Sequence, residues 1–397
     1  TLKGLIPQHI NGVLEGLIEF KGSDIRDLST NERMQSGLLF QNPSSQMIQR
    51  TVRQELAFGL ENMRVSQLQM KQMIEKTAID YSIERLLDSP LVTLSGGEKQ
   101  KIALISILLT EPEIVLLDEP TAFLDPKSAT ELLLVLRKFL EERTAVIVEH
   151  NLGYLKQHLN RAIQIDNNGQ LAEQELSSID WNPKLPCLQR VNNSEDIITI
   201  ENLNFSYPGR KIFRELNFSM KKGEITSITG SNGIGKSTLL KLIAGVISKF
   251  DGSIKLEGKE LKGLKQDVIF SRIALLFQNP ENHFIFQTIS EEVNNNTEYL
   301  DAIGLSGREE SNPFTLSEGQ KRRLSLSIVQ SMKRDVVLLD EPTFGQDTEN
   351  KIKLIKLISQ MRDAGTSILI VSHDLPFVEA VSDKIYNLDN YGFERTR

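Results

Sequence analysis

Short apolar runs that end in polar residues recur along the chain. The segments "IVLLD" at 114–118, "VVLLD" at 336–340 and "ILIV" at 368–371 have the length and composition of strands buried on both faces of a sheet. Apolar residues at helical spacing occupy other stretches, such as "KSTLLKLIAGVI" at 236–247. The pattern predicts an α/β fold around a mostly parallel sheet.

The same pattern occurs twice, so the chain is a tandem repeat. Four pairs of segments match in the same order: 38–46 with 275–283, 93–105 with 315–327, 114–125 with 336–347, and 144–152 with 366–375. Gln278 lies 237 residues after Gln41, whereas Asp340 lies only 222 residues after Asp118. The second copy is therefore about fifteen residues shorter between these points.

The repeat predicts two domains joined by a linker. We expect the first domain at 1–171, the linker at 172–196 and the second domain at 197–397. The linker has weak periodicity, two prolines and many polar residues, which are typical of a connecting segment. Its Trp181 and Cys187 are better explained by packing on a domain surface than by chemistry.

A glycine-rich loop at 230–238, "GSNGIGKST", fits the phosphate-binding pattern G-x-x-x-x-G-K-[ST]. A β-rich run precedes it and a helical run follows, which is the context that this pattern requires. Lys236 would reach the β- and γ-phosphates, and Ser237 would bind Mg²⁺. Upstream, Tyr207 in "FSYPG" either stacks on adenine or simply packs on the domain. The nucleotide-binding residues predicted in the loop are Gly230, Ser231, Asn232, Gly233, Ile234, Gly235, Lys236, Ser237 and Thr238.

The loop occurs once, although the segments downstream of it occur twice. Continuing the repeat backwards aligns Gly4 with Gly245, which puts Thr1 about four residues past the position of Thr238. We therefore expect the first copy's loop to lie just before Thr1, outside this sequence. A natural half-module is the alternative.

Acidic and other polar residues follow the apolar runs of both copies. Asp340 would hold Mg²⁺ through water, and Glu341 would orient and deprotonate the attacking water. His373 could contact the γ-phosphate, and Gln278 could reach Mg²⁺ or the water. Single residues of these types are often structural, but their recurrence at matched intervals favours function. The predicted catalytic residues are Glu341, His373, Gln278, Glu119 and His150, and the predicted metal-binding residues are Ser237, Gln278, Asp340, Gln41 and Asp118.

A serine–glycine segment opens a helical run in each copy and predicts a second anion-binding helix N-terminus. It has no lysine in the phosphate-loop position, so it is a different type of site. A plain serine N-cap is the alternative for a single copy. The predicted residues are Ser95, Gly96 and Gly97 in the first copy and Ser317 and Gly319 in the second.

Together, these motifs resemble the nucleotide-binding subunits of ABC transporters over nearly the whole chain. The fixed order of phosphate loop, Q-loop, LSGGQ-type signature, DEP box and histidine is highly specific. The segments at 38–62 and 277–282 look like those of energy-coupling-factor ATPases, which power the import of vitamins and metal ions into prokaryotic cells. The resemblance implies two tandem P-loop NTPase domains, each a mostly parallel sheet with a helical subdomain. ATP would lie between the phosphate loop of one domain and the signature of the other.

Three positions depart from the family pattern. Glu98 replaces the usual glutamine of the first signature, and Glu318 replaces the first glycine of the second. A carboxylate near the γ-phosphate would repel it, so we expect the second signature to support slower hydrolysis. The segment "FGQD" at 344–347 also differs from the usual loop, which leaves the contact between sites there open.

The resemblance implies ATP and Mg²⁺ as cofactors and a peripheral location on the cytoplasmic face of the membrane. The implied partners are a transmembrane coupling protein and a substrate-binding membrane protein. A net charge of -7 argues against a nucleic-acid partner, and a single cysteine rules out an internal disulfide framework. No apolar run approaches the ~18 residues of a membrane span. The alternative is a tandem ABC ATPase that acts in solution on ribosomes or nucleic acid; a regulatory pair without turnover is disfavoured by Glu119 and Glu341.

An importer ATPase needs a docking surface, and the apolar residues beside the two Q-loops are the prediction for it. They are Pro43, Met47, Ile48 and Val52 in the first copy and Pro280, Phe284, Ile285 and Phe286 in the second. The alternative is that these side chains pack inside the helical subdomain.

Overall fold

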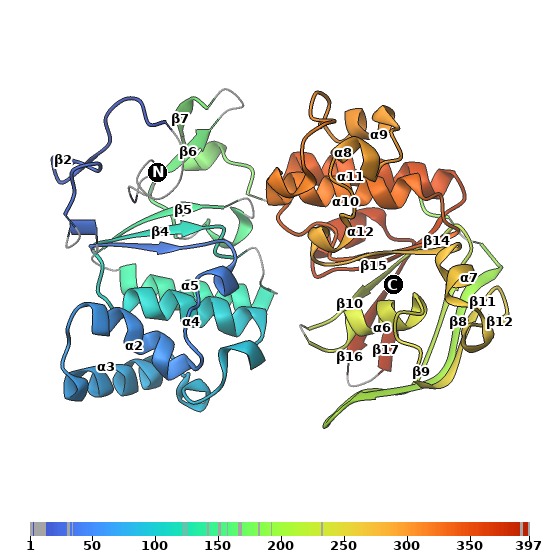
Figure 1. The fold of residues 1–397 in the computed structure, drawn as a ribbon, viewed down its shortest axis with the longest axis horizontal. Coiled ribbons are helices and arrows are strands. Elements are labelled where there is room, and N and C mark those ends of the chain that lie inside the picture. Colours follow the sequence, from blue (N-terminus) through green and yellow to red (C-terminus); the bar gives the residue numbers. More distant parts are fainter. Residues whose placement is uncertain are drawn as a thin grey trace. The chain divides into compact units, whose positions relative to one another are not determined.

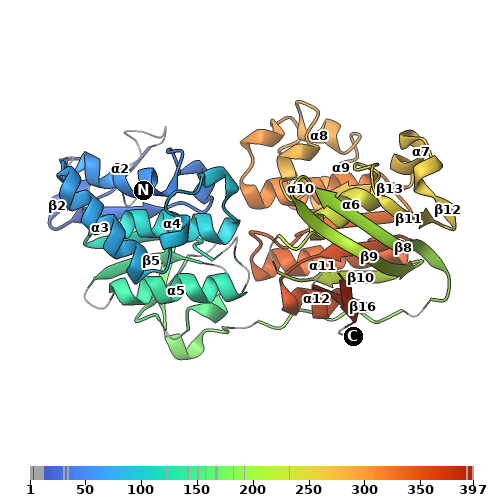
Figure 2. The ribbon, with the colours of Figure 1, turned by 90° about the horizontal axis from the view of Figure 1, so that it is seen from below.

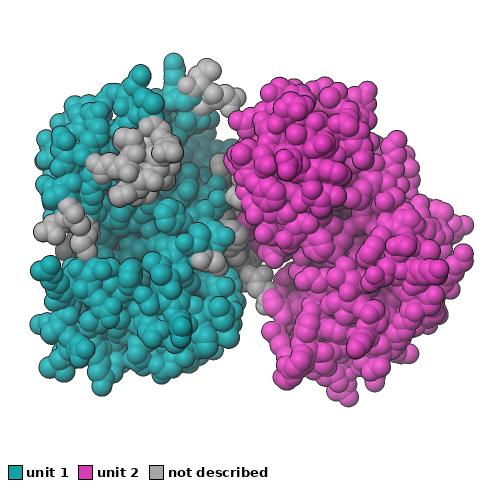
Figure 3. Space-filling view, in the orientation of Figure 1, with its two compact units in different colours: residues 1–182 teal, residues 183–397 magenta. Residues whose placement is uncertain are grey.

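The computed structural model divides into two compact units, Thr1–Asn182 (unit 1) and Pro183–Arg397 (unit 2) (Figures 1, 2 and 3). The residues that the structure describes are 3, 13–29, 32–33, 35–121, 124, 126–140, 143–149, 152–156, 158–165, 169–181, 183–191, 193–231, 233–389 and 392–395. The division falls inside the expected linker, whose exact bounds stay a prediction. Across the described ranges, no helix is long and apolar enough to cross a membrane.

Unit 2 is built on a six-stranded sheet with the order β13-β14-β15-β10-β16-β17. The first five strands run parallel and the last is antiparallel. The strands are β13 (Ile273–Leu276), β14 (Val336–Asp340), β15 (Ser367–Val371), β10 (Ile225–Thr229), β16 (Lys384–Asp389) and β17 (Gly392–Arg395). The apolar runs predicted at 336–340 and 368–371 thus form two neighbouring central strands, β14 and β15.

Helices and a second sheet cover the two faces of this sheet (Figure 1). Alternate residues of each strand belong to separate hydrophobic clusters: Leu338 and Leu369 pack with α6, whereas Val337 and Ile368 pack with α11 and α12. This period of two is the geometry of a strand that is buried on both sides. The helices are α6 (Lys236–Ile243), α7 (Gln266–Phe270), α8 (Ile289–Glu292), α9 (Thr297–Ala302), α10 (Glu318–Ser331), α11 (Thr348–Asp363) and α12 (Leu375–Val381).

An antiparallel sheet with the order β12-β11-β8-β9 lies on the α6 side of unit 2. Its strands are β8 (Asp196–Tyr207), β9 (Arg210–Lys221), β11 (Asp251–Leu256) and β12 (Lys259–Glu260). The long hairpin of β8 and β9 is prominent in Figure 2. Tyr207 pairs with Arg210 where this hairpin turns.

The segment 183–191 packs along unit 2. The Leu188 N–H donates to Ala380 O at 2.8 Å, and the Val191 N–H donates to Asp383 Oδ1 at 2.7 Å. Leu185 and Leu188 contact the cluster around α11 and α12. Cys187 is exposed, so the packing predicted for it on a domain surface is wrong.

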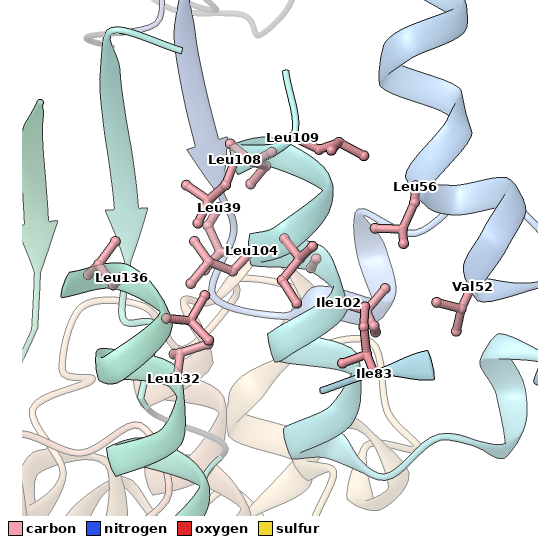
Figure 4. Close-up of a cluster of buried hydrophobic side chains, with 14 of the residues drawn as sticks. Leu39, Val52, Leu56, Ile83, Ile102, Leu104, Leu108, Leu109, Leu132 and Leu136 are labelled. Carbon is pink, nitrogen blue, oxygen red and sulfur yellow. The ribbon is translucent and has the colours of Figure 1, made fainter. Parts of the chain in front are cut away.

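Unit 1 repeats part of this design around a parallel sheet with the order β3-β4-β5. Four helices pack on one cluster of buried side chains, shown in part in Figure 4. The strands are β3 (Ser36–Leu39), β4 (Ile114–Asp118), β5 (Thr144–Val148) and two antiparallel pairs, β1 (Glu19–Phe20) with β2 (Ser23–Asp24) and β6 (Ala162–Ile165) with β7 (Leu171–Gln174). The helices are α2 (Val52–Asn62), α3 (Gln67–Asp80), α4 (Gly96–Leu108) and α5 (Pro126–Leu140).

The strand β5 is less buried than its counterpart β15. Val146 and Val148 are 39% and 50% exposed, whereas the matching Leu369 and Val371 are fully buried between β14 and β10. Among the described residues, β5 pairs with β4 only. The central strand position that β10 fills in unit 2 has no equivalent in the described part of unit 1.

The helical subdomain of unit 2 is the shorter one, as the fifteen-residue difference predicts. In unit 1 it contains α2 and α3, which have 11 and 14 residues. In unit 2 the corresponding α8 and α9 have only 4 and 6 residues. A small separate cluster around Leu300 and Leu324 holds these short helices on α10.

Candidate ATP site

The phosphate loop connects the end of β10 to the start of α6, as predicted. Gly235 is the N-cap of α6 with φ 119°, and a Cβ there would lie 2.5 Å from Ile212 Cγ2. Gly230 has φ 144°, and a Cβ there would lie 2.6 Å from Leu388 O. Both positions therefore require glycine. Asn232 lies outside the described residues.

Lys236 and Arg210 hold the loop from two sides. The buried Lys236 donates from Nζ to Gly230 O at 2.7 Å and to Ser231 O at 3.0 Å. Arg210 donates from Nη2 to Gly233 O at 2.6 Å, a contact that the motif did not predict. Since Tyr207 pairs with Arg210, the loop lies beside the turn of the hairpin that carries this tyrosine. Tyr207 is exposed, with its ring edge-on to Phe205 at 5.0 Å.

Asp340 is buried at the end of β14, and its side chain is hydrogen-bonded to Ser237 at the start of α6. Burial raises the pKa of Asp340 to about 6, although the hydrogen bond with Ser237 opposes this shift. Among the described residues, its Oδ1 has no hydrogen-bond partner. A buried carboxylate oxygen without a partner beside a hydroxyl fits a hard cation with oxygen ligands, such as Mg²⁺.

Glu341 follows Asp340 in the left-handed region, with φ 51°. Its N–H donates to Val371 O at 2.8 Å, which extends the pairing of β14 with β15 by one bond. Glu119 in unit 1 has φ 45° and donates in the same way to Val148 O at 2.8 Å. A positive φ is uncommon for residues other than glycine and is costly. Its recurrence at both predicted catalytic glutamates indicates that the side chain must leave the strand in this direction.

His373 lies next to Glu341. Its Nδ1 is 3.0 Å from Glu341 Oε1, and its backbone N–H donates to Glu341 Oε2 at 3.3 Å. Burial alone would lower the pKa of His373, but the hydrogen bond and the negative charge of Glu341 outweigh it, so this pKa is raised. The imidazole and the carboxylate therefore lie within hydrogen-bonding distance of each other at the end of β14.

Unit 1 brings a different pair together. Gln41 donates from Nε2 to Glu119 Oε2 at 2.7 Å, so the predicted Q-loop glutamine contacts the predicted base directly. Asp118 ends β4, as Asp340 ends β14. His150 lies outside the described residues. Thr121 Oγ1 donates to Glu149 Oε2 at 2.6 Å, a contact that the sequence motifs did not predict.

The two signature segments begin α4 and α10 with capping boxes. Ser95 is the N-cap of α4, and its hydroxyl donates to Glu98 Oε2 at 2.8 Å. Ser317 is the N-cap of α10, where Gln320 replaces the glutamate. Gly96 and Gly97 open α4, and Gly319 lies in the first turn of α10. Glu98 thus stabilises the start of α4 through the capping box. Its carboxylate nevertheless lies at the predicted anion-binding site of unit 1.

The Q-loop of unit 2, the segment around Gln278, is held by hydrogen bonds with two residues that the sequence motifs missed. His283 Nε2 accepts from the Phe277 N–H at 2.9 Å. Arg322 on α10 donates from Nη1 to Phe277 O at 3.1 Å and from Nη2 to Gln278 O. A Q-loop contact from a residue 44 positions away leaves no periodic signal in a single sequence. The repeat did contain a hint, because His283 aligns with Gln46.

A glycine-rich loop between a strand and a helix, with acids at the end of the neighbouring strand, defines a P-loop nucleotide hydrolase. The family model described as "ABC transporter" matches residues 2–122 and 213–344, and the chain belongs to this family. It is accordingly an ATP-binding protein that hydrolyses ATP, built from two ABC ATPase domains.

Two relatives match almost the whole chain. The "Putative HMP/thiamine import ATP-binding protein YkoD" of Bacillus subtilis is 31% identical, over 98% of this chain and 82% of the relative. A "Putative ABC transporter ATP-binding protein" of Sulfurisphaera tokodaii is 32% identical, over 98% and 87%.

One solved structure matches both units. It is the complex of the archaeal ribosomal stalk protein aP1 with the archaeal ribosome recycling factor aABCE1. It matches with a TM-score of 0.64 and 22% identity, over 91% of this chain and 74% of that one. At this identity the likeness supports the fold alone.

The neutral state of His283 generates a prediction about pH. Burial and then the charge of Arg322 lower the pKa of His283 from 6.5 to about 4. Between these pH values the unfolded state binds the proton and the folded state does not, so stability is lost as the pH falls through this window. His283→Gln keeps an acceptor, as Gln46 does in unit 1, and removes the titration.

We expect the loss in free energy of unfolding between about pH 7 and about pH 4.5 to be smaller in His283→Gln than in the unmutated chain. The difference should be on the order of 2 kcal/mol. Urea denaturation at both pH values measures it. Equal losses in the two proteins would show that His283 does not need to be neutral in the folded state.

Proposed function

We propose that the chain is the ATP-hydrolysing subunit of a membrane importer of the energy-coupling-factor type, which takes up a vitamin or a metal ion. The observation that carries this proposal is the similarity, over 98% of this chain, to a relative named as a putative HMP/thiamine import ATP-binding protein, together with the set of nucleotide-binding motifs in unit 2. Its partners are a transmembrane coupling protein and a substrate-binding membrane protein. Its place is peripheral, at the cytoplasmic face of the membrane.

In the proposed site, the residues of unit 2 bind the nucleotide and activate water. Lys236 and the loop N–H groups bind phosphate oxygens, and Tyr207 stacks on adenine. Glu341 takes a proton from the attacking water, while His373 holds the carboxylate in place. Mg²⁺ would neutralise phosphate charge, held by Ser237, Asp340 and Gln278.

The signatures complete the proposed sites across the two units. Ser95, Gly96 and Gly97 face the nucleotide bound at the phosphate loop of unit 2. The other site combines Gln41, Asp118, Glu119 and His150 with Ser317 and Gly319. This head-to-tail arrangement rests on the family resemblance.

Glu341→Gln separates binding from hydrolysis. The substitution keeps the shape of the side chain and removes the base, so Mg·ATP binding should persist while phosphate release slows by roughly 10²-fold or more. Phosphate release and equilibrium nucleotide binding measure the two effects. Lys236→Ala is the control and should lose both. An unchanged rate in Glu341→Gln would exclude Glu341 as the base.

The docking surface expected beside the Q-loops needs correction, because four of its eight residues are buried and a fifth is partly buried. Pro43, Val52, Pro280 and Phe284 are buried, and Met47 packs against the core of unit 1. The exposed members are Ile48, Ile285 and Phe286. They follow the turns η1 (Pro43–Ser45) and η7 (Pro280–His283).

These three residues form the two docking patches that we now propose, one on each unit. Ile48 is 69% exposed and Ile285 is 80% exposed. In each unit a buried glutamate fixes this segment: Glu55 accepts from the Ile48 N–H at 3.1 Å, and Glu292 accepts from the Ile285 N–H at 2.7 Å. Exposed apolar side chains on a rigid backbone are suited to binding a partner.

Ile48→Asp combined with Ile285→Asp should release the chain from membranes that contain the partner, with at least a tenfold loss of binding, because each change puts a charge into an apolar contact. Co-sedimentation with such membranes measures the loss. The matched control is Leu68→Asp with Ile352→Asp, at exposed apolar positions away from the Q-loops. Equal retention of both variants would refute this docking surface. If the unmutated chain binds no membrane partner, the soluble ATPase is the better explanation.

A further inference from the structure

The Phe277–Gln278 segment of unit 2 is held from two directions. His283 accepts a hydrogen bond from the Phe277 N–H, and Arg322 donates to the carbonyl oxygens of Phe277 and Gln278. Arg322 is 2% exposed, so its charge and donors are committed inside the protein. Its Cζ also lies 5.8 Å from the ring centroid of Phe344, in the loop that follows Glu341.

Arg322 lies on α10, the helix that begins at the signature segment of unit 2. Ser317 is the N-cap of α10, and Arg322 follows five residues later on the same helix. A helix of 14 residues with a capping box is rigid over so short a distance. The guanidinium therefore links the signature end of α10 to the Q-loop and to the loop after the predicted base.

Unit 1 has only half of this arrangement. Gln46 Oε1 accepts from the Phe40 N–H at 3.1 Å, as His283 does from Phe277. The counterpart of Arg322 is Gln100, which is fully buried on α4. Neither atom of its side-chain amide has a hydrogen-bond partner among the described residues. The link from signature helix to Q-loop carbonyls is thus made in unit 2 and not by Gln100 in unit 1.

We propose that Arg322 is a positioning residue that makes the signature and the Q-loop of unit 2 move as one body, and that unit 1 lacks this coupling. The proposal rests on the proposed function in one respect: in the head-to-tail arrangement, the signature and the Q-loop of one unit serve different ATP sites. Arg322 then couples the signature at one site to Gln278 at the other, and this coupling is reciprocal.

The chemistry of arginine suits this role. A planar guanidinium can donate to two neighbouring carbonyl oxygens at once, and charge-assisted bonds in a buried place are strong. A lysine offers one compact charge and cannot span both oxygens in a fixed geometry. Loss of Arg322 leaves the carbonyl groups of Phe277 and Gln278 without this partner, which frees the Q-loop from α10.

Three variants of the full chain test the proposal. Arg322→Gln introduces the residue found in unit 1, and Arg322→Lys keeps the charge without the fork. Arg323→Gln is the matched control, because Arg323 is the next residue of α10 but donates to Ile303 O and Asn350 Oδ1. ATP hydrolysis and amide hydrogen exchange are measured for all of them.

Since Arg322 does not belong to the predicted nucleotide-binding residues, KM for Mg·ATP should stay within about twofold. The kcat should fall roughly tenfold in Arg322→Gln and in Arg322→Lys, the scale of an energetic coupling between sites. A role of the positive charge alone would predict rescue by the lysine. Hydrogen exchange of residues 275–287 should accelerate in both Arg322 variants, while exchange in α11 of these variants should not change. In the Arg323→Gln control, exchange of residues 275–287 should not change.

Unchanged exchange in the Q-loop of Arg322→Gln, or an equal effect of Arg323→Gln, would overturn the proposal. Faster exchange throughout unit 2 would also overturn it, because Arg322 would then stabilise the whole unit and not the Q-loop in particular. Failure of the proposed function is distinguishable: the unmutated chain would show no hydrolysis or no membrane partner, while the exchange comparison would still decide whether Arg322 holds the Q-loop.

Discussion

The parallel register of three central strands is the constraint on which the site of unit 2 depends. Ile228 on β10 and Asp340 on β14 are both paired with Val371 on β15. The carboxyl ends of the three strands therefore lie at one edge of the sheet, which brings the phosphate loop, the two acids and His373 together from distant parts of the chain. The positive φ of Glu341 completes this edge, because it lets one more backbone bond form while the carboxylate meets the imidazole.

Among the described residues, the side-chain contacts of the two predicted catalytic glutamates differ, although both follow a strand in the same register. Glu119 is bound by Gln41 of the Q-loop, whereas Glu341 is bound by His373. In unit 2 the Q-loop backbone is instead held by Arg322. The carboxylate has different electrostatic surroundings in the two cases, because one neighbour is a glutamine amide and the other is a histidine imidazole. Among the described residues, the matched motifs of the two units therefore make different contacts.

The elements of the sheet and the phosphate loop were predictable because each is determined by a local pattern. The apolar runs at 114–118 and 336–340 coincide with β4 and β14, and the glycine positions of the loop require glycine for steric reasons. The helix expected at 236–247 is shorter, since α6 ends at Ile243. Pairwise contacts were not predictable: Arg322 and Arg210 act on backbone carbonyls, which any sequence provides. Exposure was also misjudged for Phe284, because its burial depends on the small cluster around Leu300.

The helical subdomain of unit 2 is shorter than that of unit 1, but it keeps the capping box and the buried glutamate of the longer one. The deletion reduces α8 and α9, yet Thr288 still forms the capping box that Thr51 forms in unit 1. Burial raises the pKa of Glu292, and its two backbone hydrogen bonds from Ile285 and Phe286 oppose this shift. A buried acid is costly, so its retention in a subdomain that lost other residues requires a compensating role. That role is the fixed backbone of the segment beside the Q-loop, where the nucleotide site and the proposed docking surface meet.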